Sequence, residues 1–149
     1  MSEAPKTRFG IQRIYIKNSS FEAPNSPSIY RSPWQPKVKV DLNTKATSLG
    51  EDAYEVLLRL TVTAELEEKV AFLAEIEQAC IVTAGGFEPA ALDQMLGAYV
   101  PSLLFPYARE AIDSLVVKGS FPAVMLAPVN FDVLYQQTKQ QKDNTEAAH

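Results

Sequence analysis

A long stretch in the middle of the chain alternates apolar and polar residues with a period of two, and this pattern constrains the fold more than any other feature. Every second residue from Tyr54 to Val62 is apolar, and a similar alternation runs from about Lys69 to Thr83. Side chains on a β-strand point alternately to opposite faces, so the pattern predicts strands with one buried face. Gly85-Gly86 ends it, and short polar segments separate the strands, which favours antiparallel hairpins.

Two more strands are predicted N-terminal to this region. Residues 37–42 alternate Lys or Asp with Val or Leu, and residues 9–21 interleave apolar and polar side chains. Four prolines between residues 22 and 36 remove backbone donors and disfavour helix and inner strand, so we expect an ordered crossover loop there. Strict alternation along the first strand places Phe9, Ile11 and Tyr15 on one face and Ile14 and Ile16 on the other.

After Gly86 the apolar period changes to that of an α-helix. Ala108, Ala111, Ile112, Leu115 and Val116 form an apolar stripe. Gly119 follows the stripe and is predicted to end the helix as its C′ residue. Two prolines, at positions 101 and 106, predict a short helix or turn first and a main helix that begins between residues 102 and 106.

A second helix is predicted to begin at Asn130, whose side chain is suited to an N-cap. Its apolar face would consist of Phe131, Leu134, Tyr135 and Thr138. The polar residues 139–149 are expected to form a disordered tail, and residues 1–8 a flexible N-terminus.

The predicted fold class is therefore α+β, in a single domain over residues 9–138. It consists of a four-stranded antiparallel sheet, with the crossover loop between its first two strands and two main helices packed on one face. The helices carry more apolar surface than one sheet face of this size requires, which indicates self-association.

Charge and hydropathy limit the classes of partner. The chain has 14 basic and 18 acidic residues and a net charge of −4, so no basic field attracts nucleic acid. It lacks the run of about 20 apolar residues that crosses a bilayer. Residues 1–9 lack the apolar core of a signal peptide. We therefore expect a cytoplasmic protein that binds no nucleic acid and does not insert into membranes.

The residues needed for most catalytic and metal sites are scarce. Cys80 is the only cysteine, so it cannot form an intrachain disulfide, which fits the reducing cytoplasm. His149 is the only histidine and the last residue, which argues against Ser-His-Asp and Cys-His sites. Structural zinc needs about four Cys or His ligands. We expect no enzyme activity, no metal and no cofactor.

Seven short strings in the chain resemble the SecB family of bacterial export chaperones in order and spacing. None of them encodes chemistry, but together they span most of the chain, from residue 11 to residue 132. They are Ile-Gln-Arg-Ile-Tyr (11–15), Phe-Glu-Ala-Pro-Asn (21–25), Trp-Gln-Pro (34–36), Tyr-Glu-Val (54–56), Leu-Gly-Ala-Tyr (96–99), Leu-Phe-Pro-Tyr-Ala-Arg-Glu (104–110) and Leu-Ala-Pro-Val-Asn-Phe-Asp (126–132).

The resemblance implies a homotetramer, built as a dimer of dimers, that holds precursor proteins unfolded and passes them to the SecA ATPase. The family binds unfolded polypeptide in a groove formed by the crossover loop, the second strand and the helices. The residues of this chain implied for that groove are Trp34, Val38, Val40, Leu42, Leu126 and Tyr135. Each of them would otherwise be expected simply to belong to the core.

The resemblance also implies a surface that binds SecA, formed by Glu22, Leu73, Glu75 and Glu77. Position 18 is Asn18, where an aspartate is common in the family, so the chain has one charge fewer there. Without the resemblance, Glu75 and Glu77 would be a solvated strand face. The polar tail matches the family only weakly.

Three other interpretations stay open from the sequence. A SecB-like chaperone dedicated to one antitoxin would share the fold but serve a single client. A small enzyme could divide acid and base roles between Glu75 and Glu77, which share a strand face. A structural oligomerisation module would account equally well for the apolar helices.

Overall fold

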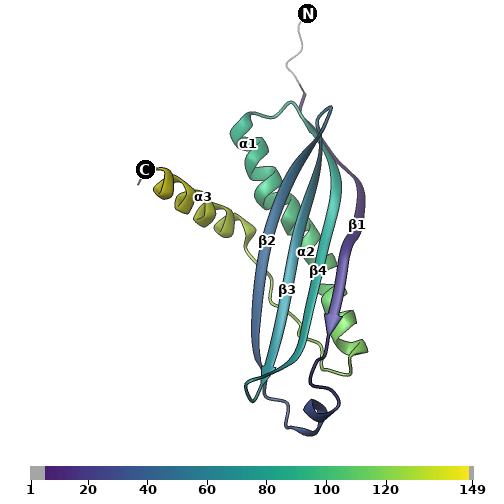
Figure 1. Cartoon of the computed structure of the whole chain (residues 1–149). Coiled ribbons are helices and arrows are strands. Elements are labelled where there is room, and N and C mark those ends of the chain that lie inside the picture. Colours follow the sequence, from purple (N-terminus) through teal and green to yellow (C-terminus); the bar gives the residue numbers. More distant parts are fainter. Residues whose placement is uncertain (1–5, 148–149) are drawn as a thin grey trace, which may run out of the picture.

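The computed structural model describes residues 6–147, and side chains from residue 6 to residue 141. Four strands form one antiparallel sheet in the order β1-β4-β3-β2, and a long helical segment crosses one face of it (Figure 1). This confirms the predicted α+β fold. The elements are β1 (Arg8–Glu22), η1 (Ser28–Arg31), β2 (Lys37–Gly50), β3 (Ala53–Leu66), β4 (Lys69–Gly85), α1 (Pro89–Gln94), η2 (Met95–Tyr99), α2 (Val100–Lys118) and α3 (Phe131–Ala147).

The core lies between the two central strands and α2. On β3 the apolar residues of the alternating pattern, Val56 to Val62, are fully buried on the side that faces the helices. Leu104, Ile112 and Val116 of α2 are fully buried against them. The apolar residues that give β3 and β4 a period of two therefore pack against those that give α2 its helical period.

The predicted faces of β1 are wrong, because two β-bulges interrupt its alternation. The register with β4 shifts between Ile11 and Arg13 and again between Ile16 and Asn18. Each bulge inserts one unpaired residue and so exchanges the two faces for the residues beyond it. Paired residues share a face, and by that criterion Phe9, Ile11, Ile14 and Ile16 all lie on the helix side of the sheet, with Tyr15 on the opposite side.

The main helix begins earlier than predicted. Helical structure is continuous from Pro89 to Lys118, as α1, a π-helical turn η2 and α2. Both Pro101 and Pro106 lie inside this segment, and Pro101 occupies the first turn of α2 directly after the π-helical turn. The Val100 amide donates to the Met95 carbonyl, five residues earlier, so the usual i to i−4 ladder is already interrupted where Pro101 lacks its N–H group.

Gly119 does end α2, but not as the left-handed residue. Its φ is −81°, and the positive φ of 65° belongs to Ser120. The Phe121 amide donates to the Val116 carbonyl and the Ser120 amide to that of Val117, which is the Schellman arrangement with Ser120 at C′. Gly119 is required for another reason, since a Cβ there would lie 2.4 Å from Cζ of Phe21.

Helix α3 begins as predicted and continues further than predicted. The Asn130 side chain accepts a hydrogen bond from the Val133 amide at 3.1 Å, which confirms the N-cap. The helix runs to Ala147, through most of the segment expected to be a disordered tail. Gln, Lys and Glu dominate that segment and have good helix propensity, which polarity alone does not reveal. Residues 1–5 and 148–149 of the expected flexible ends lie outside the described residues, and Arg8 already belongs to β1.

Candidate functional site

An apolar strip follows the helix-side face of the edge strand β2. Val38, Val40 and Leu42 pair with Ala64, Val62 and Leu60, which are fully buried on that side. The strip itself is only partly covered, because Val38 is 44% exposed and Val40 is 40% exposed. The structure therefore places three of the predicted groove residues on one accessible surface.

The crossover loop brings aromatic side chains to one end of this strip. Trp34 is half-buried, with its ring centroid 5.3 Å from that of Phe121 and 6.4 Å from that of Phe72. Two hydrogen bonds fix the loop, from Asn25 Nδ2 to the Val70 carbonyl and from Tyr30 Oη to the Gly119 carbonyl. Regular structure in the loop is limited to the short η1, and these two contacts hold the loop against the rest of the molecule.

Residues 119–130 connect α2 to α3 and carry Leu126. Asp113 of α2 holds this connection, since its Oδ1 accepts the Val124 amide at 2.9 Å and the Met125 amide at 3.3 Å. Leu126 is half-buried and packs against the core, whereas the preceding Met125 is 78% exposed. The sequence analysis did not identify Met125, although a flexible, exposed thioether suits promiscuous apolar contacts.

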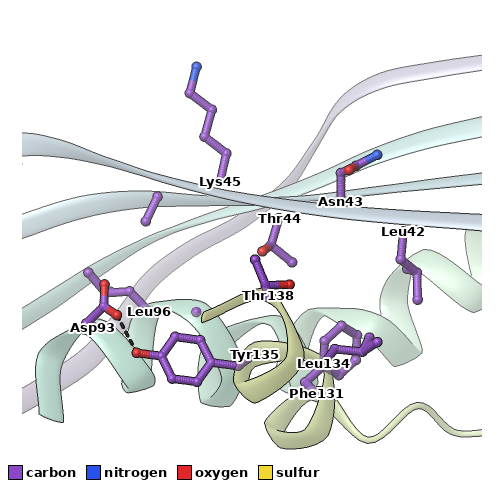
Figure 2. Close-up of a pocket in the computed structure, with 12 residues that line it drawn as sticks. Leu42, Asn43, Thr44, Lys45, Asp93, Leu96, Phe131, Leu134, Tyr135 and Thr138 are labelled. Atoms are coloured by element: carbon purple, nitrogen blue, oxygen red, sulfur yellow. Dashed lines mark hydrogen bonds between the residues drawn. The ribbon is translucent and has the colours of Figure 1, made fainter. Parts of the chain in front are cut away.

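A cleft of about 470 Å³ lies between β2 and α3, at the far end of the strip from the crossover loop (Figure 2). Leu42 and Thr44 point from β2 toward α3, whereas Asn43 and Lys45 point away from it. All four residues predicted for the face of the second helix line the cleft: Phe131, Leu134, Tyr135 and Thr138.

Tyr135 is tied to the floor of this cleft. Its hydroxyl donates a hydrogen bond to Oδ2 of Asp93 on α1, and this bond, together with burial, raises the pKa of Tyr135 to about 12. Leu42 and Tyr135 are thus the two predicted groove residues that share the cleft, and Trp34 does not line it. Sequence reasoning missed Asp93, because nothing in the local pattern links it to a residue 42 positions away.

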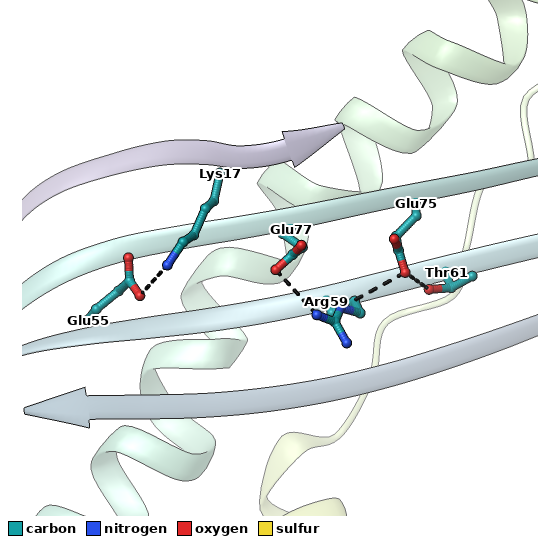
Figure 3. Close-up of polar contacts among 6 residues, drawn as sticks. All are labelled: Lys17, Glu55, Arg59, Thr61, Glu75 and Glu77. Carbon is teal, nitrogen blue, oxygen red and sulfur yellow. Dashed lines mark hydrogen bonds and ion pairs between the residues drawn. The ribbon is translucent and has the colours of Figure 1, made fainter. Parts of the chain in front are cut away.

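The opposite face of the sheet carries the residues predicted to bind SecA. Glu22 pairs with Leu73, and Ser20 and Asn18 pair with Glu75 and Glu77, so all of these side chains lie on one face of β1 and β4. Figure 3 views this face, with the helices behind the sheet. Arg59 of β3 pairs with both carboxylates, at 3.9 Å from Glu75 and 3.5 Å from Glu77. The surface is acidic, but its charge is partly compensated.

A second polar network lies on the same face, near the other end of the sheet. Tyr15 of β1 donates to Glu55 of β3 across β4, and Lys17 Nζ lies 2.9 Å from the other oxygen of that carboxylate. Burial and the Glu55 bond raise the pKa of Tyr15 to about 12. The bonds from Tyr15 and Lys17 lower the pKa of Glu55. The buried Ala79 lies between Tyr15 and β3, and its small side chain leaves room for this contact.

Large apolar side chains also remain exposed away from the cleft. On the helix side of β1, Phe9, Ile11 and Ile16 are exposed, and Tyr99 of η2 packs edge-on against Phe9. Tyr107 and Val117 of α2 are more than half exposed. Apolar surface therefore remains exposed on α2, as predicted for the helices, and also on β1, where it was not predicted.

The described residues also bear on metal binding, on membrane-spanning helices and on the enzyme interpretation. No group of three or more His, Cys, Asp or Glu side chains is placed to hold a metal ion within the part of the chain that the structure describes. None of the described helices is long and apolar enough to cross a membrane. The carboxylates of the enzyme interpretation, Glu75 and Glu77, are both paired with Arg59 on a sheet face.

Comparison with known proteins places these features in a family. The model of the family described as preprotein translocase subunit SecB matches residues 2–142. Protein-export protein SecB of Marinobacter nauticus is 54% identical over 94% of this chain and 85% of its own length. The same protein of Stutzerimonas stutzeri is 58% identical over 87% of this chain and 79% of its own length, and that of Hahella chejuensis is 50% identical over 99% and 93%.

A solved structure has the same fold. The chain resembles a SecB-like chaperone of Mycobacterium tuberculosis, solved in complex with a peptide from the HigA1 antitoxin, with a TM-score of 0.68. The match covers 82% of this chain and 91% of the other at 14% identity, so it bears on the fold alone. The family model and the relatives bear on descent as well, and the chain belongs to the SecB family of protein-export chaperones.

Proposed function

We propose that this protein is a holdase that binds unfolded precursor proteins in the cytoplasm and delivers them to SecA for export. The observation that carries the proposal is the partly exposed apolar strip of β2, which runs from the aromatic cluster of the crossover loop to the cleft under α3. A folded client would have buried the side chains that fit this surface, so the unfolded form is bound preferentially.

The energetics of such a surface favour the binding of many different client sequences over the selection of a few. Burial of apolar area contributes about 25 cal/mol per Å² whatever the sequence that supplies it. Each contact is weak, but several copies of the strip in a homotetramer, a dimer of dimers, would bind one long chain at many points and raise its effective affinity. No nucleotide or cofactor is required for this activity.

The opposite sheet face is suited to a second partner. Glu22, Leu73, Glu75 and Glu77 lie together there, away from the strip, so a client and SecA could be bound at the same time. The exposed Leu73 supplies apolar contact, and the carboxylates around it supply charge that is sensitive to salt.

Calorimetric titration tests the holdase function. The protein is titrated with a reduced, unfolded export precursor and separately with the folded form of the same precursor. We expect binding of the unfolded form only, with a strongly negative heat-capacity change from apolar burial. An absence of binding to both forms would refute the proposal and favour a structural oligomerisation module.

Titration with purified SecA tests delivery separately. Glu75→Gln removes a charge at the centre of the predicted surface, and Glu88→Gln removes an exposed charge at the start of α1 as a matched control. We expect weaker binding and a smaller salt dependence only for Glu75→Gln. Equal affinities for the two variants would place the SecA contact elsewhere.

The alternative of a chaperone dedicated to an antitoxin has less support. The relatives at 50–58% identity are named protein-export proteins, whereas the chaperone solved with an antitoxin peptide is 14% identical. Competition between two unrelated unfolded precursors for the same protein would distinguish a general holdase from a dedicated one.

A further inference from the structure

One side chain, Tyr135, links helix α3 to the long helical segment at the floor of the cleft. Its hydroxyl reaches Asp93 of α1 (Figure 2). Its ring lies against Gly97 of η2. Asp93 and Gly97 are four positions apart, so they lie one above the other on the same face of the helical segment. The two residues thus hold one tyrosine between them: Asp93 accepts its hydroxyl, and Gly97 contacts its ring.

The ring contact requires the absence of a side chain at position 97. A Cβ on Gly97 would lie 2.9 Å from Cδ2 and 3.0 Å from Cε2 of Tyr135, which is closer than real Cβ atoms approach other atoms. Gly97 itself has no positive φ that would call for glycine. Glycine at position 97 therefore permits the close approach of the Tyr135 ring.

Tyr135 contacts the body of the molecule about one turn beyond the start of α3. The first turn is fixed by the buried Phe131, whose ring meets Phe105 edge-on at 5.8 Å, and by the Asn130 cap. Residues 136–141 are exposed. Leu42 and Thr44 of β2 form the wall of the cleft opposite α3, and β2 is hydrogen-bonded to β3 in the sheet.

We propose that Tyr135, seated on Gly97 and bonded to Asp93, sets the distance between α3 and β2 and so limits the size of client side chain that the cleft admits. The inference rests on the proposed function, because it assigns the cleft to client segments. Tyr135 is on this basis a positioning and specificity-determining residue: it excludes large side chains by holding α3 close to the sheet.

The distance can be measured without any client. Spin labels are placed at Asn43→Cys on β2, which points away from the cleft, and at Gln137→Cys on α3, in a Cys80→Ala background diluted with unlabelled protein. Pulsed electron paramagnetic resonance then gives the distribution of distances. We expect a longer and broader distribution in Tyr135→Phe and in Asp93→Ala than in the parent.

Two variants serve as controls. Asp93→Asn keeps a hydrogen-bond acceptor and is expected to retain the parent distribution. Tyr30→Phe removes a tyrosine hydroxyl that donates to the Gly119 carbonyl at 2.7 Å, outside the cleft, and is expected to leave the distribution unchanged. An unchanged distribution in Tyr135→Phe would overturn the proposal, as would an equal broadening in Tyr30→Phe.

A peptide series then tests the consequence for selectivity. Unstructured peptides that differ at one position, Val or Trp, are titrated into the parent and into Tyr135→Phe. We expect the ratio of Trp-peptide to Val-peptide affinity to rise several-fold in the variant, and an unchanged ratio would refute the size limit. Failure of the parent to bind any peptide would instead refute the holdase function, while the distance measurement would still decide whether Tyr135 positions α3.

Discussion

At the scale of single residues, the closest packing constraint at the end of α2 falls on Gly119. Its backbone φ of −81° is open to any residue, but a Cβ would lie 2.4 Å and 2.7 Å from two ring atoms of Phe21. The Gly119 carbonyl also accepts the Tyr30 hydroxyl, so the crossover loop and the end of α2 meet at this point. A methyl group here would separate them.

Gly119→Ala is therefore expected to destabilise the fold by about 1–3 kcal/mol, the usual cost of overpacking. Chemical denaturation measures the change. Gly10→Ala is the matched control, because a Cβ at position 10 meets nothing within 4 Å. Alanine replaces glycine in a strand there, so we expect no loss of stability. Equal losses in the two variants would contradict the role of Phe21.

Tyr15 and Glu55 give a second prediction at this scale, one that depends on pH. Burial and the bond to Glu55 raise the pKa of Tyr15 from 10.0 to about 12, so the folded state favours the protonated hydroxyl. The resulting stabilisation is fully present below pH 10.0 and is lost as the pH rises toward 12. Stability in this alkaline window should fall less in Tyr15→Phe than in the parent.

Glu55 responds in the opposite direction in the same variant. Its pKa is lowered chiefly by the bond from Tyr15, so Tyr15→Phe should raise that pKa toward the ordinary value. Carboxyl-carbon NMR of Glu55 during an acid titration measures the shift. An unmoved Glu55 pKa would show that Lys17, the second donor, is sufficient to hold the carboxylate.

At the scale of secondary-structure elements, the buried side chain of α3 among its described residues, Phe131, lies at the start of the helix. Phe131 is buried against Phe105, whereas most of the later residues of the helix are exposed. Regions with few buried apolar contacts open locally without global unfolding. The helix should therefore open independently of the sheet.

Phe131→Ala is expected to release α3 while leaving the sheet intact. Hydrogen exchange followed by mass spectrometry should show faster exchange in residues 131–141 and unchanged protection in β3 and β4. Val133→Ala, which trims an exposed apolar residue of the same helix, is the control and should leave exchange close to that of the parent. Faster exchange throughout the sheet would mean that α3 is part of the global folding unit.

The elements also show where sequence reasoning succeeds and where it fails. β3 and β4 could be predicted because their helix-side residues are buried. Buried positions need apolar side chains, so apolar residues recur at every second position of these strands. β1 could also be predicted as a strand, but its two faces could not be assigned, since its bulges fall at Gln12 and Lys17, polar residues with no distinctive turn chemistry. The same holds for Tyr135 and Asp93, whose pairing depends on how α3 and α1 meet in three dimensions.

At the scale of the whole molecule, the subunit leaves an apolar surface that its own elements do not cover. Phe9, Ile11 and Ile16 on β1 and Val117 on α2 are exposed on the helix side. This observation fits the proposed homotetramer, because burial of such a surface between subunits would stabilise an assembly.

Ile16→Glu is expected to shift the protein toward smaller species at the same concentration, because a charge on the exposed edge of β1 would be costly to bury. Sedimentation velocity measures the distribution of species. Asn43→Glu, on the opposite edge strand and across from Arg59, adds the same charge and should leave the assembly unchanged. Identical sedimentation of the two variants would exclude β1 from the interface.

The strand order has a consequence for the synthesis of the chain. β1 is made first, yet its only partner in the sheet is β4, which is made last, while β2 and β3 can pair with each other as soon as both emerge. A ribosome adds about 5–20 residues per second, so β1 waits several seconds without a hydrogen-bonded neighbour. Some apolar side chains of β1 stay exposed even in the folded chain. During that interval all of them are exposed to solvent, as the apolar segments of the proposed clients would be.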